Sequence, residues 1–164
     1  MDRRQFILAF SAGAALLGAA PARAECGEMG ASEFVETTYQ QQARLHASNV
    51  APERDEFFAT FSRHLRKLMR PPRRGDRNLP LGPVLNVFFG RGVPPHTEIT
   101  VGKVKLVSGQ DDGPATISVE LGYKGETHTV LVHALRQQDR WRIANVIYDS
   151  GKSLLDHYRD TTWR

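Results

Sequence analysis

Cysteine is almost absent from this chain, which contains a single one, Cys26, in 164 residues. A lone thiol cannot close an internal disulfide, so the chain is not a small scaffold held together by disulfide bonds. The fold must instead depend on a hydrophobic core. A chain of this length is long enough to bury one as a single domain.

A strong charge of either sign is also missing. The chain has 22 Lys and Arg against 18 Asp and Glu, a formal net charge of +4. Proteins dedicated to nucleic acid usually carry a larger and more clustered positive charge, so no nucleic-acid partner is expected. After residue 24 no apolar run approaches the ~18 residues that a membrane-spanning helix needs.

Familiar catalytic and cofactor motifs are lacking as well. Residues 151–153 read Gly-Lys-Ser, like the end of a phosphate-binding loop, but that motif needs a glycine where this chain has Val146. No serine stands in a nucleophile elbow. His128 and His133 are five residues apart on one expected strand and so face opposite sides of it. Neither a cofactor nor a metal is therefore expected.

The N-terminal segment has the three parts of an export signal. Arg3-Arg4 precedes an apolar stretch over residues 8–20, and Ala22-Arg23-Ala24 provides small residues at the positions that a signal peptidase reads. The arginine pair followed by Gln-Phe-Ile resembles the twin-arginine consensus. The pattern predicts a signal peptide over 1–24, a periplasmic location, and a single α+β domain over 25–164 with its core at about 32–159.

Two other interpretations of this region require residues that the segment does not have. A membrane anchor would need a longer apolar run than residues 8–20 provide. A lipid anchor on Cys26 would need apolar and small residues before it, whereas Arg23 and Glu25 stand there. We therefore expect Cys26 to be a free thiol in a flexible start.

Helical periodicity occupies the first part of the predicted domain. Ser32 can cap a helix over about 32–46. A second helix is predicted over about 53–69, because its apolar residues are spaced four, four and three apart at Phe57, Phe61, Leu65 and Leu68. Residues 70–83 are rich in proline and arginine and predict a loop, and 84–89 form a short apolar run that fits either a strand or a helical turn.

The second half of the chain changes to strand periodicity. Strands are predicted around 99–106, with a bend at Gly102, and at 117–123, 128–135 and 141–148, joined by short turns that favour an antiparallel meander. A short helix over about 152–159, capped by Ser150, ends the pattern. The predicted fold is α+β: a cone-like curved antiparallel sheet packed on N-terminal helices, with a short C-terminal helix.

The segment from Trp141 to Tyr148, followed by Gly151 to Leu155, resembles the bacterial family called domain of unknown function 3828. The resemblance covers roughly residues 32–159. It implies a fold similar to the nuclear transport factor two-like superfamily, whose cone can hold an enzyme site or a non-catalytic binding site. By analogy with exported relatives, an immunity protein against a periplasmic amidase toxin is a further alternative.

Candidate site residues follow from the cone. His133 lies in the middle of an apolar strand and is the one catalytic candidate. Tyr39, Phe61, His133 and Tyr148 are the candidates for lining a ligand pocket, with Asp149 beside the last of them.

The highest density of positively charged residues in the sequence lies between Arg63 and Arg77. Within it Arg66, Arg70, Arg73 and Arg74 are candidates for contact with a partner of opposite charge. The simpler interpretation is that basic residues favour the end of the second helix and an exposed loop.

We therefore expect an exported, non-catalytic protein that binds a small ligand or a protein partner. The alternatives are a cavity enzyme of the isomerase or dehydratase type and an immunity protein. An enzyme or a carrier predicts a roomy pocket with a polar group at its base, whereas a partner-binding protein predicts a filled cone and a contact surface.

Overall fold

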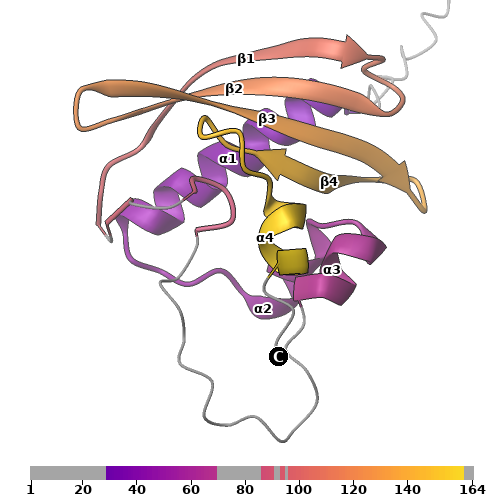
Figure 1. Cartoon of the computed structure of the whole chain (residues 1–164), viewed down its shortest axis with the longest axis horizontal. Helices are drawn as coiled ribbons and strands as arrows, with labels where there is room; N and C mark the ends of the chain where they lie inside the picture. The colour runs from indigo at the N-terminus through magenta and orange to yellow at the C-terminus, as the bar shows by residue number, and fades with distance from the viewer. Residues whose placement is uncertain (1–28, 70–85, 91–92, 95, 161–164) are drawn as a thin grey trace, which may run out of the picture.

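The computed structural model describes residues 29–69, 86–90, 93–94 and 96–160. These residues form an antiparallel sheet with helices on one face and at one end (Figure 1). The α+β prediction with a curved antiparallel sheet is thereby confirmed. The predicted signal peptide, Cys26, the loop over 70–83 and its arginines Arg70, Arg73 and Arg74 lie outside the described residues.

The sheet is a meander in which each strand pairs with the next one along the chain. Its strands are β1 (Thr100–Gly109), β2 (Ala115–Tyr123), β3 (Glu126–Gln137) and β4 (Arg140–Ile147). The register of β1 against β2 shifts between Val101 and Val104, on either side of Gly102, where the sequence predicts a bend. In β2 buried residues alternate with half-buried ones, because one face of the sheet packs on the core.

Helix α1 (Ala31–Ala47) lies across that face of the sheet (Figure 1). Its buried residues Ala31, Val35, Tyr39 and Ala43 recur every four positions and form one stripe against the sheet. Ser32 does not cap this helix. The Asp111 carbonyl and carboxylate oxygens, from the β1–β2 turn, accept hydrogen bonds from the backbone N–H groups of Ala31 and Ser32, both at 2.8 Å.

The prediction of one helix over 53–69 is wrong in one respect, because the helix is broken. Helix α2 (Arg54–Ala59) and helix α3 (Arg63–Met69) are separated at Thr60–Ser62. There the Ser62 N–H donates to the Ile143 carbonyl at 2.8 Å, and the Ile143 N–H donates to the Thr60 carbonyl at 2.9 Å. β4 is the last strand of the sheet, so one of its edges has no neighbouring strand in the part of the chain that the structure describes. The hydrogen bonds that Thr60–Ser62 form with this free edge outweigh those that one continuous helix would provide.

Helix α4 (Leu154–Asp160) begins two residues later than predicted and has a different cap. Ser153, not Ser150, caps it: its hydroxyl accepts a hydrogen bond from the Asp156 N–H at 3.1 Å and donates to the Asp156 carboxylate at 2.6 Å. Leu154 is fully buried at the start of this helix. Among the described residues, no helix combines the length and apolar character that crossing a bilayer requires.

The described part of the apolar run at 84–89 is a turn. The Gly90 N–H donates to the Asn86 carbonyl at 2.8 Å, and the Asn86 side-chain oxygen accepts from the Phe88 and Phe89 N–H groups. The Phe88 ring lies 5.7 Å from that of Tyr39 and 5.6 Å from that of Phe61. An aromatic cluster therefore fills the space between helices and sheet.

Candidate functional site

A pocket of about 770 Å³ opens where the β2–β3 hairpin approaches the segment between β4 and α4. Its apolar wall includes Phe89, Val130 and Tyr148, and its polar wall includes His128, Asp149 and Lys152. The volume falls within the range of roughly 300–1,000 Å³ that small-molecule sites occupy. The polar groups come from segments that are distant in sequence, so only the fold brings them together.

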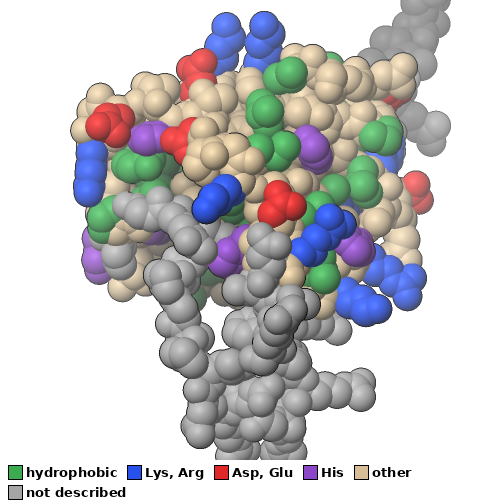
Figure 2. All heavy atoms as spheres, viewed as in Figure 1, with side chains coloured by type: hydrophobic (Ala, Val, Ile, Leu, Met, Phe, Trp, Pro, Cys, Tyr) green, Lys and Arg blue, Asp and Glu red, His purple; other side chains and the backbone are tan. Residues whose placement is uncertain are grey.

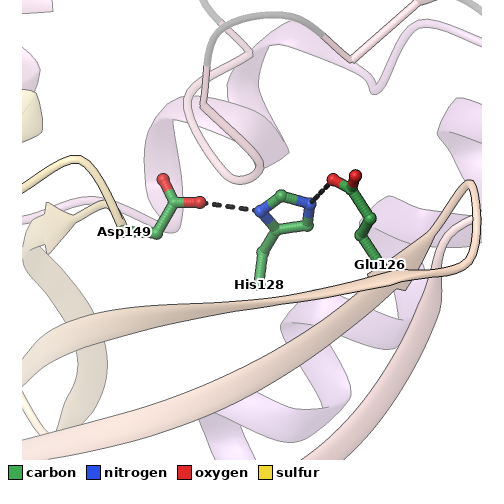
Figure 3. A network of polar contacts seen from close by, with 3 residues as sticks. All are labelled: Glu126, His128 and Asp149. Atoms are coloured by element: carbon green, nitrogen blue, oxygen red, sulfur yellow. Dashed lines mark hydrogen bonds and ion pairs between the residues drawn. The ribbon is translucent and has the colours of Figure 1, made fainter.

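His128 reaches the pocket from the core-facing side of β3. It alternates with the buried residues Val130 and Val132, and it lies opposite Leu121 of β2. Its ring nitrogen Nδ1 lies 2.7 Å from Oδ2 of Asp149 (Figure 3). A carboxylate can only accept, so Nδ1 carries the proton and donates it to this hydrogen bond.

The other nitrogen of the ring faces a second carboxylate. His128 Nε2 lies 3.5 Å from Oε2 of Glu126 (Figure 3). It is shielded from solvent and makes no hydrogen bond among the described residues. The Glu126 side chain is 75% exposed, so it can swing away from the ring at little cost. Nε2 is thus the ring atom that a ligand would meet once the Glu126 side chain moves aside.

Tyr123 forms a platform beneath the histidine. Its ring stacks on that of His128, with centroids 4.3 Å apart and planes 15° from parallel. Partial burial, then the negative charges of Asp149 and Glu126, raise the pKa of the Tyr123 hydroxyl. This hydroxyl therefore stays protonated and can donate a hydrogen bond beside the pocket.

A tight turn after β4 places Asp149. The Tyr148 N–H donates to the Lys152 carbonyl and the Gly151 N–H donates to the Tyr148 carbonyl, both at 2.9 Å. Gly151 has φ of 76°, a conformation that side-chain-bearing residues seldom adopt. The turn is therefore closed by backbone bonds, which leave the Asp149 side chain pointing at His128.

Tyr148 forms a rigid part of the wall. It is only 8% exposed, and its hydroxyl donates to the Val87 carbonyl at 2.9 Å. Burial, then the charge of Tyr158, raises the pKa of Tyr148 far above that of a free tyrosine, so the hydroxyl remains a donor. A Cβ atom on Gly90 would lie 3.1 Å from this ring, so glycine at that position allows the close approach.

The four residues proposed from sequence to line a pocket are not brought together. Tyr148 lines this pocket. Tyr39 and Phe61 are fully enclosed in the aromatic cluster. His133 is half-buried between the core-facing residues Val132 and Ala134 and so lies on the other face of the sheet.

Sequence reasoning considered His128 only as a metal ligand and missed its pairing with Asp149. The available signal was its position: a polar residue two places before Val130, in line with the buried apolar series Val130, Val132 and Ala134 of β3. The contact with a residue 21 positions later had no local signal. Within the described ranges, no group of three His, Cys, Asp or Glu side chains is arranged to hold a metal ion.

Of the four arginines proposed for a partner surface, only Arg66 is described. It is half-buried on α3 and lines a second cleft together with other basic side chains.

No family model, curated protein or solved structure matches the chain in the three comparisons with known proteins.

Proposed function

We propose that this protein is exported and binds a small amphiphilic molecule in the pocket beside His128. The observation that carries the proposal is the pairing of an apolar wall with fixed polar groups around about 770 Å³. An apolar part of the ligand would lie against Phe89 and Tyr148. Its polar part would meet His128, Asp149 and Lys152, which fix orientation while the apolar contacts supply most of the affinity.

Native mass spectrometry of the purified protein tests this proposal. We expect an added mass that is lost on unfolding. Ser150→Trp should abolish it, because Ser150 is exposed at the pocket and an indole there would fill the opening. Ser108→Trp, at an exposed position at the far end of β1, is the matched control and should retain the ligand. A bare mass, together with no thermal shift in a small-molecule screen, would contradict ligand binding here.

Acid–base catalysis is a second candidate function, favoured by one observation. Asp149 holds the proton on Nδ1 of His128, while Nε2 has no hydrogen-bond partner among the described residues. This arrangement orients a histidine for proton transfer at Nε2 once the Glu126 side chain moves aside.

Deuterium exchange separates the two functions. If His128 removes a proton from carbon, the ligand recovered from the protein in D₂O should gain deuterium, and His128→Gln should stop this. If the protein only binds, the ligand should gain no carbon-bound deuterium with either chain.

A further inference from the structure

A second concave site lies between α3 and the β3–β4 hairpin and has a volume of about 690 Å³. It shares no lining residue with the pocket beside His128. The described side chains that line it are Arg63, Arg66 and Lys67 of α3, Gln137 and Gln138 of the hairpin, and Arg142 of β4. Figure 2 shows Lys and Arg side chains gathered at the edge of the molecule where α3 lies in Figure 1.

The cleft concentrates positive charge. Arg63, Arg66 and Lys67 are three and four positions apart on a helix, so they project from the same side of α3. Arg142 faces them from the sheet. None of the described residues that line the cleft is acidic. Burial, then the charges of Arg66 and Arg140, lowers the pKa of Arg142, as expected where cations crowd together.

The polar groups of the cleft are also hydrogen-bond donors, so they suit a ligand that carries acceptor oxygens. The Gln137 side-chain oxygen already accepts from the Arg63 backbone N–H at 2.9 Å, which leaves its NH₂ group as the donor. One guanidinium nitrogen of Arg142 donates to the Trp141 carbonyl at 3.2 Å, and this bond orients the remaining donors. Guanidinium groups bind the paired oxygens of phosphate in a bidentate manner.

We propose that this cleft binds a compact phosphate group, either a soluble phosphate ester or diphosphate, or the head group of an anionic lipid. Its concave shape favours a compact polyanion over the broad surface of an acidic protein. Four cations around one cavity lose part of their mutual repulsion when an anion enters. The proposal is independent of the ligand pocket, since no lining residue is shared.

Calorimetric titration of the purified protein with inorganic pyrophosphate tests the proposal. We expect saturable binding at one site that weakens as salt is raised. Arg66→Gln and Arg142→Gln should each reduce affinity by about tenfold, the usual effect of losing one charged hydrogen bond. Lys103→Gln, which removes the same charge from an exposed position on β1, should have little effect. Ser150→Trp should bind pyrophosphate like the original chain.

Further titrations distinguish the source of the phosphate. Binding to glycerol phosphate and not to phosphatidylglycerol vesicles would support a soluble ester, and the reverse would support a lipid head group. Vesicles of phosphatidylcholine provide the uncharged control. Three results would overturn the proposal. One is a loss of pyrophosphate affinity with Lys103→Gln as large as that with Arg66→Gln, and another is binding that does not saturate. The third is tighter binding of poly-glutamate than of glycerol phosphate or phosphatidylglycerol. Because Arg142 is half-buried, circular dichroism must show that its variant is folded, and Arg66→Gln repeats the test at a helical surface.

Discussion

At the scale of single residues, hydroxyl groups in the core differ in how they are satisfied. The Tyr148 hydroxyl donates to the Val87 carbonyl, whereas the hydroxyl of the fully enclosed Tyr39 has no partner among the described residues. Burying a polar group without a hydrogen bond costs about 1–3 kcal/mol. The two tyrosines therefore provide a matched pair. Replacement by phenylalanine removes a hydrogen-bonded hydroxyl from Tyr148 and, from Tyr39, a hydroxyl that no described residue pairs with.

Tyr39→Phe should raise the free energy of unfolding by about 1 kcal/mol, because it removes an unsatisfied hydroxyl and keeps the ring. Tyr148→Phe should lower it by a similar amount, because it leaves the Val87 carbonyl without its donor. Urea unfolding at neutral pH measures both. A loss of stability with Tyr39→Phe as large as that with Tyr148→Phe would show that the Tyr39 hydroxyl has a partner in solution.

The same variants should also change how the stability of the protein depends on pH. Burial, then the charge of Tyr148, raises the pKa of Tyr39, and the pKa of Tyr148 is raised as well. Above about pH 10 the unfolded chain loses phenol protons that the folded chain retains. Stability should therefore fall as pH rises beyond about 10, and Tyr39→Phe should make that fall shallower. Urea midpoints between pH 8 and 11 record the difference.

At the scale of elements, the helix ends depend on contacts that cross the fold. Asp111 caps α1 from a turn 79 residues away from Ser32. The break between α2 and α3 occurs where Thr60–Ser62 pair with Ile143. Two helices have a cap from a sequence neighbour: the Ser62 hydroxyl accepts from the Leu65 N–H at 3.3 Å at the start of α3, and Ser153 caps α4. Long-range hydrogen bonds thus determine where α1 begins and where α2 stops.

Ser153→Ala should destabilise the protein by about 1 kcal/mol, the usual cost of losing an N-cap. Ser150→Ala is the matched control: its side chain is exposed, and its removal should change stability by less than about 0.5 kcal/mol. Thermal or urea unfolding of the two variants provides the comparison. If both substitutions cost the same, the cap described for α4 does not contribute in solution.

At the scale of the whole molecule, the two concave sites lie on different parts of one small fold. The ligand pocket is formed by the end of the sheet and the turn before α4, and the basic cleft by α3 and the β3–β4 hairpin. If both proposals hold, the protein would bind a small molecule and a phosphate group at the same time. The proposed periplasmic location would place both sites outside the cytoplasm.

The proposed export provides the prediction at this scale. Replacing Arg3 and Arg4 by lysine should block transport, since the twin-arginine route reads the arginine pair. Cell fractionation should then recover unprocessed chain in the cytoplasm, whereas the original chain should be recovered in the periplasm beginning at Glu25. Equal export of both chains would argue against this route, and a chain that keeps residues 1–24 would argue against cleavage.

Local patterns in the sequence predict the order and type of the elements, except that they indicate one helix where α2 and α3 stand. The four-residue spacing in 57–65 and the alternation in 117–123 are local patterns, and each element takes the form that buries its apolar side. Three features arise only in the folded chain: the helix break at Thr60–Ser62, the pairing of His128 with Asp149, and the convergence of α3 with Arg142. These depend on edge pairing and on contacts between distant segments, whose energies no local pattern encodes.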